Sequence, residues 1–240
     1  MSRVLEAENE NRRRMVNYLF EESIIRKSFD RDRQLAAEQS SVFEVTFIEG
    51  KPAFRRISIN GQPLTPEEER SEIARLRQLA EDRRTNPGIP SPAEQRRRSH
   101  PFRAFLRFHE FTMGGSEVVD GRDCWVVDSK PAHAPRGENL DEQRVAHSSA
   151  KFWIDKHTLH RMRMDVSGQK PEGPAKVREF TSYEWRQRDG EVWLVTAIRT
   201  VLPLHSGPIA YYEGEQTYSK YRRFTSESTV QVNEELAAPP

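Results

Sequence analysis

The sequence predicts an α+β domain built on a long, curved antiparallel β-sheet. Segments in which apolar and polar residues alternate follow one another through short turns, the pattern of consecutive hairpins. Two helix-start motifs interrupt this run, so we expect covering helices inserted between the strands of one domain. We assign residues 1–230 to that domain and residues 231–240 to a flexible tail.

The first 40 residues predict a helix, a strand and a connection. Residues 3–17 contain good helix formers and no Gly or Pro, and the run Arg12-Arg13-Arg14 suits the solvated face of a helix. Residues 19–29 read as a strand, and residues 35–40 are expected to be a charged connection.

Residues 42–48 and 54–59 predict two neighbouring strands. The turn signal Gly50-Lys51-Pro52 separates them, and Asn60-Gly61, a strong tight-turn pair, follows the second. Three apolar side chains fall on one face of the first strand: Phe43, Val45 and Phe47.

A helical insert is expected at about residues 65–106. In Thr65-Pro66-Glu67-Glu68 the Thr can cap free backbone amides, Pro suits the first helical position, and the last Glu can reach back to the cap. Ser91-Pro92-Ala93-Glu94 repeats this motif and starts a second helix. The stripe expected to be buried on the first helix is Ile73, Leu76, and Leu79 or Ala80.

Residues 108–224 return to strands separated by turns. Asp120-Gly121 and Asp189-Gly190 are tight-turn pairs, and residues 155–158 join two further strands. Residues 131–145 contain Pro, Gly and charge without periodicity, and are therefore expected to form a long loop.

Composition and charge disfavour several classes of protein. The net charge is +1, whereas nucleic-acid binders usually carry a basic excess. No apolar run reaches the length of a membrane-spanning helix, and the charged first residues lack the apolar core of a signal peptide. We therefore expect either a cytoplasmic protein or one whose export signal is absent from this chain.

No set of residues predicts catalysis, a metal site or a cofactor site. His157 and His160 lie three apart in a segment that reads as a hairpin turn, so surface histidines are favoured over metal ligands. The single cysteine, Cys124, lies among apolar strand residues and is expected to be a buried, inert thiol. Neither a nucleophile elbow nor a glycine-rich phosphate loop is present, and we expect no enzyme activity.

Several strands carry large apolar residues on both faces. Trp125 and Val127, for example, alternate with Cys124 and Val126. One face must meet the helices, and the other is then either an exposed apolar surface or the core of a closed barrel or sandwich. The pattern alone favours these two alternatives about equally.

Short motifs along residues 18–224 resemble bacterial envelope proteins known as outer-membrane lipoprotein-sorting proteins. The motifs are Lys51-Pro52-Ala53-Phe54-Arg55-Arg56, Asn60-Gly61-Gln62-Pro63-Leu64-Thr65-Pro66-Glu67-Glu68, Gly115-Ser116-Glu117-Val118-Val119-Asp120-Gly121-Arg122, Lys151-Phe152-Trp153-Ile154-Asp155, Asp189-Gly190-Glu191-Val192-Trp193-Leu194 and Tyr218-Ser219-Lys220-Tyr221-Arg222-Arg223-Phe224. That family is similar to the LolA/LolB-like lipoprotein carriers. The resemblance implies an unclosed β-barrel, a strongly bent sheet with helices against its concave side. It also implies a periplasmic location and no cofactor.

The expected function is that of a periplasmic carrier that holds lipid or lipoprotein acyl chains on the concave face of the sheet. The alternative is an envelope interaction or sensor module that binds a protein partner without lipid. The candidate lining residues are Phe43, Val45, Phe47, Trp125, Met162, Met164, Trp193 and Leu194.

Overall fold

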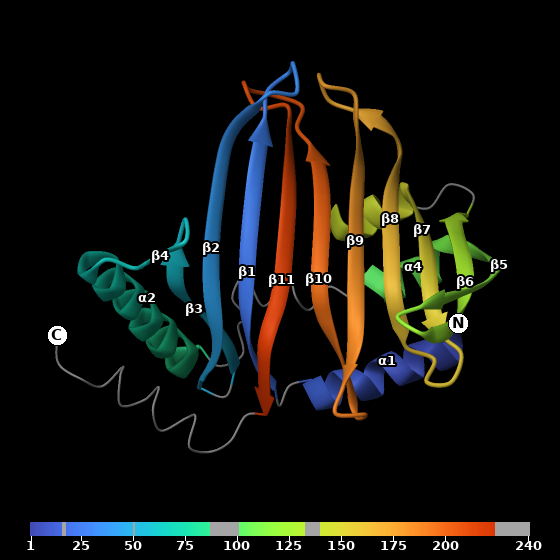
Figure 1. The fold of residues 1–240 in the computed structure, drawn as a ribbon, viewed down its shortest axis with the longest axis horizontal. Coiled ribbons are helices and arrows are strands. Elements are labelled where there is room, and N and C mark those ends of the chain that lie inside the picture. The colour runs from blue at the N-terminus through green and yellow to red at the C-terminus, as the bar shows by residue number, and fades with distance from the viewer. Residues whose placement is uncertain (16–17, 50, 87–100, 133–139, 224–240) are drawn as a thin grey trace. The chain divides into compact units, whose positions relative to one another are not determined.

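A computed structural model describes residues 1–15, 18–49, 51–86, 101–132 and 140–223 (Figure 1). In chain order the elements are α1 (Ser2–Met15), β1 (Tyr18–Phe29), β2 (Leu35–Ile48), β3 (Lys51–Ile59), β4 (Gln62–Pro63), α2 (Pro66–Thr85), α4 (Pro101–Phe108), β5 (His109–Val119), β6 (Arg122–Pro131), α5 (Leu140–Ala146), β7 (Ser148–Asp155), β8 (Arg161–Glu172), β9 (Val177–Arg188), β10 (Val192–Pro203) and β11 (Tyr211–Arg223). No helix among these residues is long and apolar enough to cross a membrane.

The strands form one 11-stranded antiparallel sheet in the order β4-β3-β2-β1-β11-β10-β9-β8-β7-β6-β5. Strands β5 to β10 pair with their neighbours in sequence, as consecutive hairpins require. Strands β4 and β5 lie at the two edges, so the sheet does not close. The prediction of an unclosed antiparallel sheet with inserted helices is confirmed.

Two-residue turns connect several of these strands, and their backbone explains the residues found there. Both residues of Asn60-Gly61 have positive φ, 48° and 76°. Asp120-Gly121 repeats this conformation, and Asp189-Gly190 has the same positive φ within a three-residue connection. Asn, Asp and Gly tolerate a left-handed backbone, which gives the turn the twist of the strands it joins. The predicted tight turns are confirmed.

The chain divides into two compact units. The first contains residues 1–16, 26–38 and 99–215, and the second contains residues 17–25, 39–98 and 216–240. Strands β1, β2 and β11 contribute to both units. The assignment of residues 1–230 to a single domain stays a prediction.

In the second unit, helix α2 lies against strand β3 and the end of β2. Leu76 and Ala80 are buried with Ile48 and Ala53, which confirms the central part of the predicted stripe. The sequence pattern missed two buried charged side chains on this helix. Arg83 donates to the carbonyls of Ile48, Lys51 and Pro52, and Glu72 accepts from the amide of Arg56 at 2.8 Å.

The start of α2 forms the predicted capping box. The Thr65 hydroxyl accepts from the amide of Glu68, and the Glu68 carboxylate accepts from the amide of Thr65 at 2.8 Å. Pro66 occupies the first turn, where its missing N–H leaves no helical hydrogen bond unmade. The second motif, Ser91-Pro92-Ala93-Glu94, lies outside the described residues, as do Arg96-Arg97-Arg98 and the tail 231–240.

Two expectations were wrong. Residues 35–40, expected to be a connection, form the first half of strand β2, because pairing in the sheet satisfies a backbone whose side chains are largely exposed. Residues 140–145, expected to lie in a loop, belong to the short helix α5, whose Val145 and Ala146 are buried. Residues 133–139 of that expected loop lie outside the described residues.

Candidate functional site

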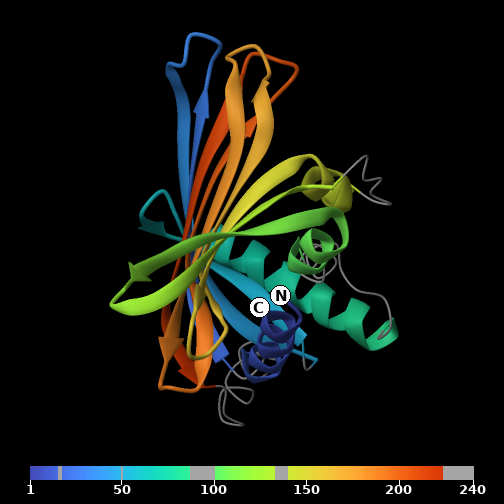
Figure 2. The same ribbon diagram turned by 90° about the vertical axis from the view of Figure 1, so that its right-hand side faces the viewer.

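One face of the sheet in the first unit is covered by helices α1, α4 and α5, which lie on the same side of strands β6 to β9 (Figure 2). We call it the helix-covered face. Its strand residues form the largest apolar cluster of this unit: Val127, Ala150, Phe152, Ile154 and Met164, with Trp125, Val166, Tyr183 and Trp185 partly buried around them.

Strand alternation places these side chains together. Phe152 pairs with Val127 on one side and with Met164 on the other, and residues opposite each other in an antiparallel pair point to the same face. Their sequence neighbours Val126 and Trp153 instead belong to a second cluster with Cys124, Met162 and Trp193. The expectation of large apolar groups on both faces is confirmed.

Helix α4 fills the helix-covered face with aromatic rings. Phe102 and Phe105 are 1% and 0% exposed, and their ring centroids lie 5.7 and 5.4 Å from that of Phe152. Both contacts are edge-to-face, the geometry that the charge distribution of aromatic rings favours. Val4 of α1 and Val145 of α5 complete the cluster. The interior of this unit is therefore occupied by its own side chains.

A buried ion pair lies among these apolar groups. Arg161 of β8 donates through Nε and Nη2 to the two carboxylate oxygens of Glu8 on α1, each at 2.8 Å. The side chains of Arg161 and Glu8 are 7% and 15% exposed. Burial raises the pKa of Glu8, but attraction by Arg161 and its hydrogen bonds outweigh burial, so this pKa lies below its ordinary value. The Glu8 carboxylate is therefore ionised at neutral pH.

Beyond the helices, the same face continues to the sheet edge as an exposed apolar strip of Met113, Val118 and Trp125. Met113 pairs with Val127, and Val118 pairs with Asp123, which places both side chains on the helix-covered face. They are 63% and 68% exposed, whereas Trp125 is partly buried against the cluster. Among the described residues, only Leu35 is another large hydrophobic side chain this exposed.

The structure distributes the eight sequence-predicted lining residues over several places. Trp125 and Met164 lie on the helix-covered face, and Met162 and Trp193 lie in the second cluster of the first unit. Leu194 is 3% exposed in β10. Phe43, Val45 and Phe47 lie on β2 in the second unit, where Val45 is buried and the other two are half-buried. The role of all eight residues in ligand binding stays a prediction.

Sequence reasoning missed two parts of this face. Arg161 alternates with apolar residues in β8, and from that pattern it reads as a solvent-facing charge. A bulge in the β7–β8 pairing, between Trp153 and Ile154, changes which β8 residues face inward. The exposure of Met113 and Val118 also depends on which part of the sheet the helices cover. The alternation of residues within a strand does not predict this coverage.

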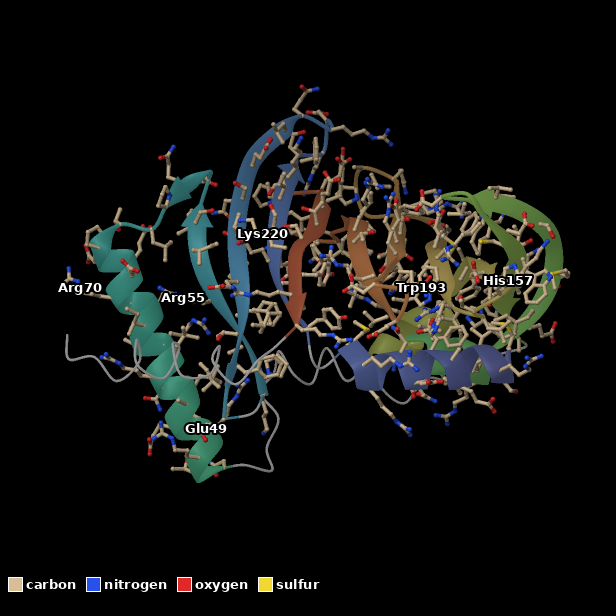
Figure 3. All side chains as sticks on the ribbon, turned by 60° about the horizontal axis from the view of Figure 1, so that its bottom comes forward. Glu49, Arg55, Arg70, His157, Trp193 and Lys220 are labelled. Atoms are coloured by element: carbon tan, nitrogen blue, oxygen red, sulfur yellow. The ribbon has the colours of Figure 1, made fainter. Side chains whose placement is uncertain are left out.

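The second unit contains an open pocket of about 230 Å³ beside strand β3 and the start of helix α2. Arg55, which Figure 3 shows between β3 and α2, is one of its lining residues. The others are Arg56, Ile57, Pro63, Leu64, Glu69 and Glu72. With four charged side chains in its wall, this pocket suits an acyl chain poorly.

The histidines and the cysteine have structural surroundings. His157 is exposed at the β7–β8 turn, away from Trp193 (Figure 3), and its amide donates to Asp155. His160, expected at the surface, is instead half-buried with its ring 5.7 Å from that of Trp193. Cys124 is fully buried, and burial raises the pKa of its thiol to about 11, as expected for an inert residue. Within the described ranges, no three His, Cys, Asp or Glu side chains are placed to hold a metal ion.

No protein-family model matches the chain, and no curated protein sequence does. Among solved structures, it is similar to an outer membrane lipoprotein-sorting protein domain from Vibrio parahaemolyticus, with 13% identity, a TM-score of 0.43 and 97% of each chain covered. A LolA superfamily protein from Nitrosomonas europaea has 11% identity and a TM-score of 0.42, over 94% of this chain and 93% of that one. A MucA/MucB complex from Pseudomonas aeruginosa has 8% identity and a TM-score of 0.26, over 94% of this chain and 100% of that one. All three similarities extend over almost the full length of this chain, at low sequence identity.

Proposed function

We propose that this protein is a periplasmic carrier that binds an acyl chain of a lipid or lipoprotein on the helix-covered face of the first unit. The observation that carries the proposal is the continuity of this face. Its apolar side chains run from a core under the helices to the exposed strip of Met113, Val118 and Trp125. An acyl chain that begins on the strip can extend past Trp125 towards the apolar cluster under the helices.

Binding on this face is driven by removal of apolar surface from water. Each buried methylene group contributes about 0.8 kcal/mol. Phe102, Phe105 and Val4 of the helices fill the interior of this unit. A bound acyl chain must therefore take the place of some of these side chains. Helices α1 and α4 then move away from the sheet when the acyl chain binds, while the strands keep their positions.

The test is native mass spectrometry of protein purified from cells, followed by titration with a fluorescent fatty acid. We expect a co-purifying lipid or a saturable increase in fluorescence. The double variant Met113→Ser/Val118→Ser should weaken uptake about tenfold or more, because each large aliphatic side chain contributes about 1.5–3 kcal/mol when buried.

Leu35→Ser is the matched control. Leu35 is 53% exposed and also lies in the first unit, but on strand β2, which is not part of the helix-covered face. It should leave uptake unchanged. A protein that carries no lipid and takes up no fatty acid would exclude the carrier function.

A second candidate function is an envelope interaction module that binds a protein partner without lipid. The filled interior favours it, since Phe102 and Phe105 of helix α4 are fully buried in the cluster on the helix-covered face. Strand β5 is an exposed sheet edge with Met113 and Val118, to which an extended segment could add as a further strand. In that case Met113→Ser/Val118→Ser abolishes partner binding, and no variant shows saturable uptake of fatty acid.

A further inference from the structure

The Arg161–Glu8 pair is a buried ion pair on a face that packs mainly apolar groups. The Arg161 guanidinium lies between two rings, 4.7 Å from the centroid of Phe102 and 4.6 Å from that of Trp185. Its Nη1 lies 3.3 Å from the sulfur of Met164, so the guanidinium contacts aromatic and apolar groups besides Glu8. Glu8 is the anion that neutralises this buried cation.

Burying both charges of such a pair is costly, and well-packed apolar residues of similar volume often stabilise a fold as well or better. A helix that served only to cover the face would need neither charge. The two residues of the pair also belong to different kinds of element. Arg161 belongs to the central strand β8, whereas Glu8 belongs to the N-terminal helix α1, which covers the face from outside.

If α1 is displaced, Arg161 stays on the sheet between its two neighbouring strands and loses its counter-ion. An unpaired cation beside Trp185 and Met164 then requires another anion. A guanidinium fork matches a carboxylate in two parallel hydrogen bonds, which is the geometry that Glu8 shows.

We propose that Arg161 is the binding site for the carboxylate of an anionic amphiphile, and that Glu8 occupies this site in the ligand-free protein. This inference rests on the proposed acyl-binding function and narrows its ligand class to acyl chains with a terminal carboxylate. The chain lies along Phe152 and Met164 on the helix-covered face, and its head group replaces the side chain of Glu8.

Glu8→Gln separates this role from a structural one. The amide keeps the shape of the carboxylate and one acceptor oxygen but removes the charge that competes with the ligand. Glu10→Gln is the matched control, because Glu10 lies on the same helix, is 64% exposed and pairs with Arg14. Arg161→Gln removes the site, and Arg161→Lys keeps its charge without the two-pronged geometry.

The experiment measures displacement of the uncharged reporter N-phenyl-1-naphthylamine by dodecanoate and, in parallel, by 1-dodecanol, at pH 8. We expect Glu8→Gln to bind dodecanoate about 10-fold more tightly than the parent protein, in line with a hydrogen-bonded charge. Binding of 1-dodecanol should change little, and Glu10→Gln should behave as the parent. Arg161→Gln should lose the preference for dodecanoate, and Arg161→Lys should restore part of it.

Equal responses to dodecanoate and 1-dodecanol in the parent, Glu8→Gln and Arg161→Gln would overturn the carboxylate site and leave acyl binding intact. Failure of both compounds to displace the reporter from any variant would overturn the carrier function together with this inference. Circular dichroism confirms folding of each variant. If Arg161→Gln does not fold, the comparison of Glu8→Gln with Glu10→Gln tests the carboxylate site. Equal affinity of these two variants for dodecanoate would then overturn it.

Discussion

His109 shows how a single buried side chain makes the stability of this fold depend on pH. Its Nε2 bonds to the carbonyl of Val145 at 2.7 Å, and its Nδ1 bonds to the Ser129 hydroxyl at 2.8 Å. Since a carbonyl can only accept, Nε2 donates its proton to Val145, and in the neutral ring Nδ1 then accepts from the Ser129 hydroxyl. Burial lowers the pKa of His109, and the bond to Val145 only partly offsets this effect.

We expect the unfolding free energy to decrease as the pH falls below about 6.5, the ordinary pKa of histidine. In that range the unfolded chain binds a proton that folded His109 resists, so acid favours unfolding until the lowered pKa is reached. His109→Gln should flatten this dependence, measured by urea unfolding at pH 7.5 and 5.5.

His157→Gln, at an exposed position, serves as the control. It should keep the pH dependence of the parent protein. An unchanged slope in His109→Gln would show that His109 contributes nothing to it. His160, whose pKa burial also lowers, would then be the next residue to replace.

At the scale of elements, the hydrogen bonds of its first turn determine where helix α2 begins. Its sequence has a modest apolar stripe, and the reciprocal hydrogen bonds of Thr65 and Glu68 fix where the helix begins. Thr65→Ala should therefore destabilise the second unit by about 1 kcal/mol, the usual contribution of such a cap. Urea unfolding followed by circular dichroism measures this loss.

Ser71→Ala tests the same chemical change inside the helix. Ser71 is exposed within α2, where alanine is the better helix former, so this variant should be no less stable than the parent. A similar loss in both variants would mean that the removed hydroxyl does not act as a cap.

Strand β2 and helix α5 are elements that the local sequence pattern did not predict. Residues 35–40 alternate poorly and have exposed side chains, yet they are a strand because a neighbouring strand pairs with their backbone. Helix α5 has seven residues, too few to be stable alone, and Val145 and Ala146 hold it in place by burial. Both elements form through contacts with distant parts of the chain, so no local signal predicted them.

At the scale of the whole molecule, the proposed function requires the helices to leave the face that they cover. We expect saturation with dodecanoate to increase amide hydrogen exchange in α1 and α4, because their contacts with the sheet are replaced by ligand. Strands β7 and β8 should stay as protected as before, since their hydrogen bonds are to each other.

Hydrogen exchange followed by mass spectrometry resolves these segments. Helix α2 is the internal control, since it belongs to the second unit and packs there against Ile48 and Ala53. Protection of α1 that increases on loading would contradict displacement of Glu8 from Arg161. A change of equal size in α2 would indicate a general loosening instead.

The sequence by itself determined the elements with strong local chemistry. Alternation identified most strands, Asn-Gly and Asp-Gly pairs identified the turns, and Thr65-Pro66-Glu67-Glu68 identified the start of α2. These signals act within a few residues, through backbone conformation and nearby hydrogen bonds. The presence of large apolar residues on both faces of the sheet was also predictable, because alternate residues of a strand point to opposite sides.

Only the tertiary structure decided which face the helices cover and which residues meet there. Arg161 and Glu8 are separated by 153 positions in the chain, and their contact depends on where α1 lies on the sheet and on the β7–β8 bulge. The same holds for Met113 and Val118, whose exposure depends on which part of the sheet the helices cover. Burial of a charge and exposure of an apolar side chain follow from long-range packing, which periodicity in the sequence does not encode.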